Sequence, residues 1–279
     1  MERHGDEGRR IHLTNRIRPF VLRRRKDEVA PELPPRTEIE RFVALEGGQR
    51  DLYEAVRASM HERVRLALAE QGLDRSQVVV LDALLKLRQV CCDPRLVGLS
   101  AARKVTESAK LELLMEMLDG LLVEGRRVLL FSQFTSMLAL IEQALKARGQ
   151  RYALLTGDTR DRARAVEEFQ GGEVPLFLLS LKAGGTGLNL TAADTVIHYD
   201  PWWNPAVEAQ ATDRAHRIGQ DKPVFVYRLL CAGTIEERMR SLQARKARLA
   251  QAMLGDEAGL ARALGAEDIE ALLAPGSAT

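Results

Sequence analysis

The stretch Leu176-Phe-Leu-Leu-Ser-Leu-Lys-Ala-Gly-Gly-Thr-Gly-Leu-Asn-Leu190 indicates the fold most directly. It begins with a short apolar run, which is typical of a strand that is buried on both faces of a sheet. Three glycines within four positions follow, and they let the backbone approach a ligand closely and offer N–H groups to an anion. A glycine-rich turn is common by itself, so its interpretation depends on the neighbouring segments.

The segment Pro201-Trp-Trp-Asn-Pro205 leads from a second apolar strand into a predicted helix. An asparagine followed by proline is a helix start signal, because the side chain caps the first turn and proline fits its first position. Gly219 is a stop signal. These signals predict a helix over 205–218.

The positions of Gln210, Arg214 and Arg217 are spaced i, i+4, i+7, which places all three on one face of that helix. A core helix would carry leucine or valine at these positions. Two guanidinium groups instead suit forked hydrogen bonding to phosphate oxygens. The stripe therefore predicts a phosphate-binding face, with a solvated basic face as the alternative for the two arginines taken alone.

Short apolar strands alternate with helices from about residue 108 to residue 253. Strands are predicted at 128–131, 152–155, 176–179, 195–199 and 224–229, and helices near 111–122, 136–148, 160–170 and 205–218. This alternation indicates an α/β fold, a parallel sheet with helices on both faces. Ligands bind at the carboxyl ends of such strands. That rim would gather Ser132-Gln133, Gly157-Asp158, the 182–189 loop and residues 200–204.

Three further segments flank this α/β unit, which is assigned to 106–233. Residues 1–44 are predicted to form a basic lead-in and an extended linker, because prolines between 31 and 35 prevent a continuous helix. Residues 45–105 are predicted to form a helical insertion. Residues 234–279 are predicted to form a C-terminal helical extension, which opens on a capping box at 234–237.

The composition is that of an intracellular globular protein of 279 residues. The hydrophobic fraction of 46% excludes a mainly disordered chain, and no apolar run is long enough to cross a membrane. Three cysteines without metal-ligand spacing predict reduced thiols and no metal site. The net charge is only +2, but Lys and Arg cluster near 16–26, 160–164 and 238–248. Such clusters either contact a phosphate backbone or form solvated faces.

The order strand, glycine loop, strand, aromatic turn and arginine helix resembles motifs five and six of the Swi/Snf (sucrose non-fermenting) family of DNA-dependent ATPases, within helicase superfamily two. The string Asp213-Arg-Ala-His-Arg-Ile-Gly-Gln220 is close to that family's hallmark. Four more segments resemble the family: Arg18-Pro-Phe-Val-Leu-Arg-Arg24 at the handover from the first lobe, Leu87-Arg-Gln-Val-Cys-Cys-Asp-Pro94 in the helical protrusion, Ser108-Ala-Lys-Leu-Glu-Leu-Leu114 at the start of the second lobe, and 128–134 as motif four.

The resemblance implies a RecA-like second motor lobe that takes part in ATP-driven movement along double-stranded DNA. ATP with magnesium would be held mainly by the first lobe, and Gln210, Arg214 and Arg217 would act on it catalytically. Nucleotide contacts are implied for Gly185, Gly187, Asp213 and Gln220. Contact with the DNA backbone, or support of it, is implied for Ser132, Gln133, Phe134, Lys182, Ala183, Gly184, Thr186, Asn189 and Trp202.

The resemblance also implies partners and a location. The expected partners are duplex DNA, the first RecA-like lobe of the same protein and a DNA-bound protein as remodelling target, with no membrane partner. The expected location is the cytoplasm in association with the nucleoid, or the nucleus of a eukaryote.

The sequence contains no Gly-x-x-x-x-Gly-Lys-Ser/Thr loop and no acidic pair after an apolar strand. We therefore expect half of a motor that does not hydrolyse ATP in isolation. Three alternatives stay open. The second lobe of an RNA helicase shares the paired arginines. A methyltransferase or dehydrogenase could use Gly184–Gly187, although a dinucleotide fold places that loop after its first strand. A non-enzymatic interaction module could keep the lobe and lose the motor.

Overall fold

A computed structural model describes residues 16, 30, 32–184, 187–247 and 265–275. The chain divides into two compact units, 1–33 and 34–279, and the second contains the sheet and the helices around it. The predicted handover segment at 18–24 and two of the predicted site residues, Gly185 and Thr186, lie outside the described residues. Within the described ranges, no helix combines the length and the apolar character needed to cross a membrane.

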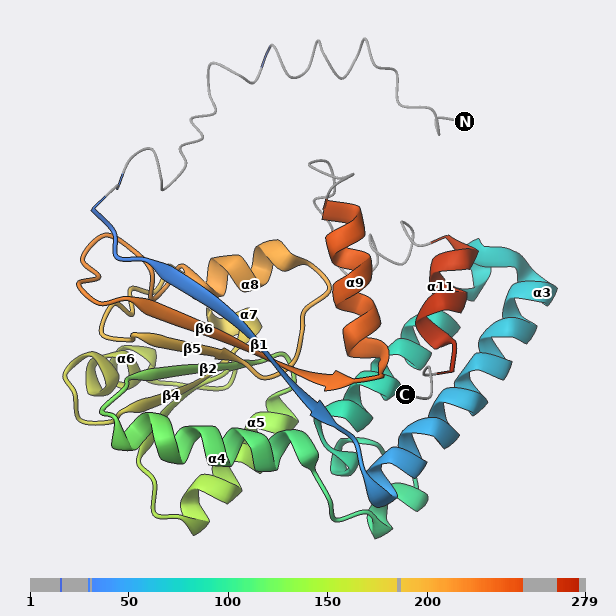
Figure 1. The fold of residues 1–279 in the computed structure, drawn as a ribbon, viewed down its shortest axis with the longest axis horizontal. Helices are drawn as coiled ribbons and strands as arrows, with labels where there is room; N and C mark the ends of the chain where they lie inside the picture. The colour runs from blue at the N-terminus through green and yellow to red at the C-terminus, as the bar shows by residue number, and fades with distance from the viewer. Residues whose placement is uncertain (1–15, 17–29, 31, 185–186, 248–264, 276–279) are drawn as a thin grey trace. The chain divides into compact units, whose positions relative to one another are not determined.

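The second unit is built on a six-stranded sheet in which every recorded strand pair is parallel, in the order β1-β6-β5-β2-β4-β3 (Figure 1). The strands are β1 (Arg36–Ala44), β2 (Val128–Ser132), β3 (Tyr152–Leu155), β4 (Leu176–Ser180), β5 (Thr195–His198) and β6 (Val224–Ala232). The central strands β2, β4 and β5 are buried along their whole length. Such strands read as continuous apolar runs because both faces of the sheet are covered. The predicted α/β fold class is thereby confirmed.

Helices cover both faces of the sheet. On one face, α4 (Ala109–Val123) and α5 (Thr135–Ala147) pack against alternate residues of the central strands, such as Leu130. On the other face, α6 (Arg162–Gln170), α7 (Leu181–Gly184) and α8 (Pro205–Thr212) pack against the intervening residues, such as Leu129. Adjacent residues of a strand point to opposite faces, so one apolar run supplies both cores.

Strand β1 is absent from the predicted strands, because its sequence RTEIERFVA mixes charged and apolar residues in a way that is also typical of a linker. It pairs in parallel with β6 along all nine residues, from Arg36 opposite Val224 to Ala44 opposite Ala232. All nine of its residues are exposed or partly exposed, as an edge strand allows. This pairing also explains why β6 extends to Ala232, beyond the predicted end at Leu229.

Helix α3 (Gly47–Cys92) is a hairpin of two antiparallel halves joined at Gly72. Gly72 has φ +71° and ψ 176°, a conformation open almost only to glycine. Contacts between the halves fix their direction: Arg63 Nη1 lies 3.4 Å from Asp82 Oδ2, and Gln49 Nε2 donates to the Val90 carbonyl at 2.8 Å. Two short 3-10 helices, η2 (Pro94–Leu96) and η3 (Ala101–Lys104), then lead to α4.

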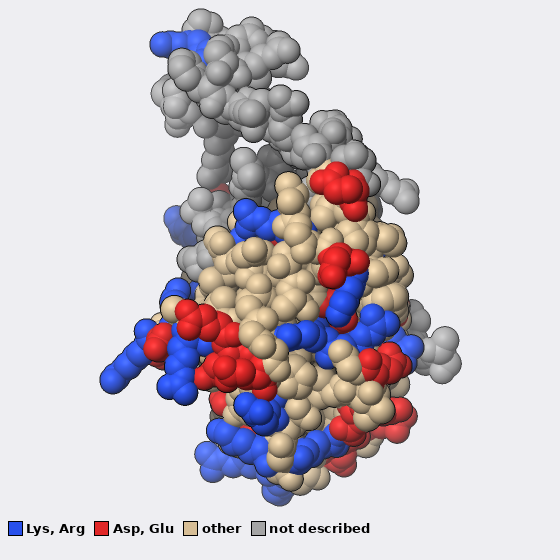
Figure 2. Space-filling view, turned by 90° about the vertical axis from the view of Figure 1, so that its left-hand side faces the viewer, with Lys and Arg blue, Asp and Glu red and all other residues tan. Residues whose placement is uncertain are grey.

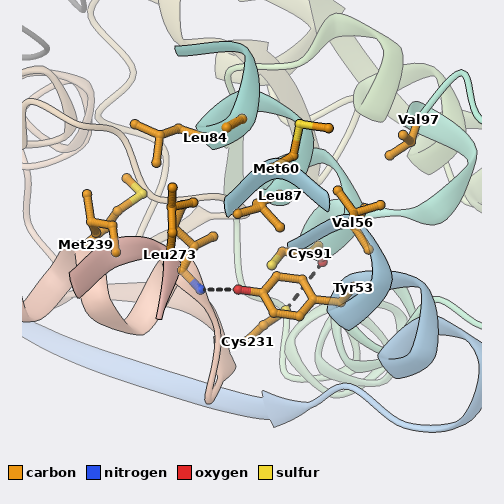
Figure 3. Packing of buried hydrophobic residues seen from close by; sticks show 14 of the residues in the cluster. Tyr53, Val56, Met60, Leu84, Leu87, Cys91, Val97, Cys231, Met239 and Leu273 are labelled. Carbon is orange, nitrogen blue, oxygen red and sulfur yellow. Dashed lines mark hydrogen bonds between the residues drawn. The ribbon is translucent and has the colours of Figure 1, made fainter. Parts of the chain in front are cut away.

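The α3 hairpin packs with α9 (Ile235–Ala247) and α11 (Ala266–Leu273) around a core of its own (Figure 3). At the start of α9 the N–H of Ile235 donates to the hydroxyl of Tyr53 at 2.7 Å. The predicted capping box is formed only in part. Thr234 Oγ1 accepts from the N–H of Glu236 at 3.2 Å, but Glu237 reaches the N–H of Gly233 instead of that of Thr234.

Candidate functional site

The carboxyl ends of the strands form one rim, toward which the strand arrows in Figure 1 point and beside which the α3 hairpin lies. Ser132 at the end of β2 donates its hydroxyl to Oδ1 of Asp200, after β5, at 2.6 Å. The N–H of Gln133 points to the same carboxylate oxygen at 3.3 Å. The opposite side, where the strands begin, carries Lys, Arg, Asp and Glu side chains lying close together (Figure 2).

Asp200 is the centre of this rim and is fully buried. Burial raises the pKa of its carboxyl to about 6, although Arg88 and the hydrogen bond from Ser132 act to lower it. Because the Ser132 hydroxyl is held by Asp200 and also accepts from the N–H of Phe134 at 3.1 Å, Ser132 supports the rim from inside. Gln133 is half-buried, and its Nε2 has no hydrogen-bond partner within the described residues.

We call residues 181–190 the glycine segment. It begins as one turn of helix, α7, and not as the loop that the sequence predicts after Ser180. The serine hydroxyl caps this turn by accepting from the N–H of Ala183 at 3.3 Å. Lys182 and Asn189 are exposed, whereas Ala183 is buried in the core beside the sheet. Gly187 has φ +49°, with open space where a Cβ would stand. Of the predicted DNA contacts in this segment whose burial the structure describes, Lys182 and Asn189 are the exposed side chains.

Helix α8 ends at Thr212, so the prediction of a helix to Ile218 is wrong. Its start is as predicted, because Asn204 Oδ1 caps the N–H of Ala206 at 3.0 Å and Pro205 takes the first position. After Thr212 the chain continues in turns. The N–H of Arg214 donates to the Ala211 carbonyl at 3.2 Å, and the Arg214 carbonyl accepts from the N–H of Leu190 at 3.0 Å.

The three residues of the predicted stripe consequently do not share one helical face. Gln210 is exposed on α8, Arg217 is exposed in the turns after it, and Arg214 between them is only 8% exposed. After Thr212 the Arg214 carbonyl is hydrogen-bonded to the N–H of Leu190, and such tertiary contacts can outweigh the helical pattern of a sequence. We call residues 210–220 the arginine segment.

The side chain of Gln220 anchors the end of the arginine segment. Its Nε2 lies 3.1, 2.7 and 3.0 Å from the carbonyl oxygens of Thr191, Ala193 and Ala215, and its Oε1 accepts from the N–H of Lys222 at 2.9 Å. A nucleotide contact by this carboxamide would have to displace main-chain partners. Asp213, also a predicted nucleotide contact, lies 3.8 Å from Arg36 of β1.

The tryptophan turn joins the rim to the helical core. Trp203 is 6% exposed and packs with the α3 hairpin, while Trp202 is half-buried on the other side. The N–H of Trp202 donates to Glu208 Oε1 at 2.7 Å, and Gln243 Nε2 donates to the Trp202 carbonyl at 2.6 Å. Glu208 is held in turn by Arg228 Nε at 2.9 Å. The turn is thus fixed from α8, β6 and α9 together.

Four buried charges organise this region without a predicted nucleotide or DNA contact, and only one of them, Asp200, belongs to the predicted rim. Arg88, Asp200, Glu208 and Arg228 each stand in an apolar stretch or directly after one. A charge inside an apolar run is a signal that could have found them, because buried charges are paired. The partner of each could not have been named, since Arg88 and Asp200, for example, are far apart in sequence.

One group of possible metal ligands occurs among the described residues. Atoms of Cys91, Cys231 and Glu236 lie within 4.8 Å of one another, all buried. Both carboxylate oxygens of Glu236 are held by Lys110 Nζ at 2.6 Å, and burial raises the pKa of the Cys91 thiol. A cation would have to displace the ammonium and stabilise a disfavoured thiolate, so these residues fit an ion pair better than a metal.

Comparison with known proteins places these elements in a family. The helicase conserved C-terminal domain matches residues 109–219, which run from α4 to the arginine segment, and the SNF2-related domain matches residues 2–96. The chain belongs to the SNF2-related family. This membership agrees with the resemblance seen in the sequence. It argues against the alternative interpretation as a methyltransferase or dehydrogenase.

Individual SNF2-related proteins align over most of this chain. It is 42% identical over 247 residues to the chromodomain-helicase-DNA-binding protein 1-like of Danio rerio, covering 85% of this chain and 24% of the relative. It is 38% identical over 242 residues to the human SWI/SNF-related matrix-associated actin-dependent regulator of chromatin subfamily A member 1, covering 82% of this chain and 23% of the relative. The chain spans about a quarter of the length of the curated relatives that it matches.

A solved structure of the same kind is the Sulfolobus solfataricus SWI2/SNF2 ATPase core in complex with dsDNA. It aligns with a TM-score of 0.71 and 30% sequence identity, over 96% of this chain and 57% of the solved chain. The six-stranded SNF2-related sheet, with the rim described above, is therefore a RecA-like lobe.

Proposed function

We propose that this chain is the second motor lobe of an ATP-dependent translocase that moves along double-stranded DNA. One observation supports it above others: hydrogen bonds join the arginine segment to the end of the glycine segment and to the residues that directly follow it. The N–H of Leu190 donates to the Arg214 carbonyl at 3.0 Å, and Gln220 holds the carbonyls of Thr191 and Ala193. A shift of the nucleotide-facing segment would therefore move the DNA-facing segment with it.

On the DNA side, the exposed Lys182 and Asn189 suit contact with phosphate and sugar groups, which are independent of base sequence. Ser132, Gln133, Phe134, Ala183 and Gly184 would support this track, and Trp202 would border it. The similar Sulfolobus ATPase core was solved with duplex DNA, which favours the same partner here. A DNA-bound protein as remodelling target, and a place in the nucleoid or nucleus, belong to the same proposal.

On the nucleotide side, the exposed Arg217 and Gln210 fit contact with phosphate oxygens. Arg217 is the first candidate for stabilising charge on the transferring phosphoryl group, because Arg214 is only 8% exposed and reaches solvent less. The arginine segment offers cationic and neutral groups but no carboxylate beyond Asp213, which lies near Arg36. These residues fit the phosphates of ATP and not its magnesium ion, which the first lobe would hold.

Bound ATP would supply the phosphoryl group whose transfer drives movement. The residues of this chain would position the reacting groups and neutralise charge. Arg217 would neutralise charge on the phosphates, and Lys182 and Asn189 would contact the DNA backbone. Gln220 would hold the two segments together. The sequence lacks a phosphate loop, so the isolated chain is expected to be inactive.

Substitution of Arg217 tests the nucleotide role in the two-lobe protein. We expect Arg217→Ala to lower DNA-stimulated ATP hydrolysis by about 10³-fold, because an arginine on the transferring phosphoryl group contributes about that factor. Arg217→Lys is expected not to restore the rate, since a point charge cannot make a forked contact. Arg148→Ala is the matched control, because Arg148 is also accessible to solvent and pairs with Asp119 at 2.8 Å. An unchanged rate, or an equal fall in DNA affinity, would contradict the assignment.

A titration of this chain with duplex DNA tests the partner. With about two or three phosphates neutralised, affinity should fall about 10- to 40-fold between roughly 50 and roughly 200 mM salt. Fluorescence anisotropy with two unrelated duplex sequences would measure both the salt slope and the expected lack of sequence preference. Tighter binding of duplex RNA than of duplex DNA would instead support the RNA-helicase alternative.

A further inference from the structure

We propose that Arg88, on the second half of the α3 hairpin, positions the rim for DNA, so that the helical insertion sets the geometry of the track. This inference rests on the proposed DNA-binding function and assigns a residue to it that contacts neither DNA nor nucleotide. Arg88 is 1% exposed, so it acts through the groups that it holds.

The guanidinium of Arg88 lies among three parts of the rim. Its Nη2 donates to the Pro201 carbonyl at 2.6 Å and lies 3.8 Å from Asp200 Oδ2. Its Cζ lies 5.6 Å from the ring centre of Trp203 and 5.8 Å from that of Phe134. One side chain from the hairpin therefore reaches the tryptophan turn after β5 and the motif after β2.

Two short paths lead from Arg88 to residues at the surface. Arg88 influences the position of the half-buried Gln133 through Asp200, because Asp200 accepts hydrogen bonds from Ser132 Oγ and from the N–H of Gln133. Arg88 also influences the position of the adjacent half-buried Trp202 through its hydrogen bond to the Pro201 carbonyl. Gln133 and Trp202 are both residues that we propose for the DNA side of the rim.

The geometry argues against a role as a simple counter-charge. The 3.8 Å separation from Asp200 is too long for a hydrogen bond, whereas the contact with Pro201 is short. A residue that only neutralised Asp200 would be expected to bond to its carboxylate. Arg88 makes its shortest bond to the main chain of the turn, which is where a positioning residue acts.

The test uses Arg88→Met, which keeps a long side chain and removes the charge and the donors. We expect duplex DNA affinity to fall by about 2- to 30-fold, in the range of residues that act through a packed network. The slope of log affinity against log salt should stay unchanged, because a buried arginine neutralises no phosphate. Tryptophan emission should also change without DNA, since the chain has only two tryptophans, Trp202 and Trp203, and both lie in this turn.

Arg57→Met is the matched control. Arg57 is an arginine of the same hairpin, and its Nη1 likewise donates to a main-chain carbonyl, that of Leu273 in α11, at 3.1 Å. Its removal disturbs the hairpin away from the rim. We expect DNA affinity and tryptophan emission to stay as in the unsubstituted chain.

The double variant Arg88→Met/Asp200→Asn allows the proposal to be tested even if the single variant does not fold. It leaves no uncompensated buried charge, and an asparagine can still accept from Ser132 and Gln133. We expect it to fold and to remain weak in DNA binding, with altered emission. Unaltered affinity and emission in the double variant would overturn the role of Arg88 alone. Failure of the unsubstituted chain to bind duplex DNA would overturn the proposed function instead.

Discussion

Two buried ion pairs join helices to other elements, and they differ in construction. Lys110 of α4 lies 2.6 Å from both carboxylate oxygens of Glu236 in α9, and both side chains are fully buried. Arg88 of α3 lies 3.8 Å from Asp200 and gives its short bond to the Pro201 carbonyl. Equal burial therefore does not imply an equal role. The Lys110–Glu236 pair, which we call the closed pair, joins two helices. The Arg88–Asp200 pair, the open pair, is linked by hydrogen bonds to groups that reach the surface.

The largest expected effect comes from opening the closed pair. Lys110→Met leaves Glu236 buried without its partner, and we expect a loss of about 3–5 kcal/mol in the free energy of unfolding. Arg88→Met should cost less, because the carboxyl of Asp200 has a pKa of about 6 and can take up a proton. Urea denaturation at neutral pH would measure both variants.

Lys110→Met/Glu236→Gln is the control for the closed pair, since it removes both charges and should recover most of the loss. DNA affinity of the folded protein should be unchanged in this variant. A fall in DNA affinity as large as that of Arg88→Met would show that the two pairs do not differ in role.

A smaller effect is expected from pH, because two buried groups beside the sheet respond in opposite senses. Burial raises the pKa of Asp200 from 3.8 to about 6. Glu236 also acts to raise this pKa, whereas Arg88, Ser132 and Lys110 act to lower it. The folded state takes up this proton first, so acidification through pH 6 to 4 favours folding through Asp200.

Burial lowers the pKa of His198 from 6.5 to about 4, with Glu208 and Glu38 acting to raise it and Arg228 and Arg240 to lower it. The unfolded state takes up this proton first, so the same acidification disfavours folding through His198. The two contributions offset each other in the intact protein.

Substitution separates these contributions. Between pH 7 and about pH 4.5, Asp200→Asn should lose more stability than the unsubstituted chain, and His198→Gln should lose less, each by on the order of 2 kcal/mol. Urea midpoints at the two pH values would measure the differences. Parallel pH profiles of the two variants would show that neither group titrates in the fold as described.

The smallest expected effect removes a cap next to the rim without touching a charge. Asn204→Ala should cost about 1 kcal/mol, because the side chain caps the first turn of α8. Asn204→Asp should keep most of the cap. DNA affinity should change little in either variant, as measured by the same anisotropy titration. A loss of affinity comparable with that of Arg88→Met would mean that any destabilisation near the rim disturbs it.

The sequence is sufficient to predict five strands of the sheet and insufficient to predict the edge strand β1. The runs at 128–131 and 176–179 predict strands that agree with the structure to within one residue, because a strand buried on both faces leaves an unbroken apolar run. The edge strand at 152–155 is also predicted, since its four residues are apolar although two of them are only partly buried. Strand β1 carries charges that an exposed edge tolerates, so its pattern resembles that of a linker. Edge position depends on neighbours, which local sequence does not specify.

For the candidate site, the sequence locates the segments but not their internal geometry. The glycine and arginine segments do lie together, through Leu190 and Gln220. The helical stripe fails at Arg214, because main-chain contacts after Thr212 override helical spacing. The domain boundaries at 44, 105 and 233, and the nucleotide and DNA roles of the site residues, stay predictions.

Strand β1 also has a mechanical consequence. It is the segment through which the chain enters the sheet, and it lies in register with β6 along nine residues. A pull along the strand axis at Arg36 would load its hydrogen bonds with β6 in shear, so they would share the force instead of breaking one after another. A force applied to the preceding chain would thus be transmitted through β1 to β6, and from β6 to the rim at its carboxyl end.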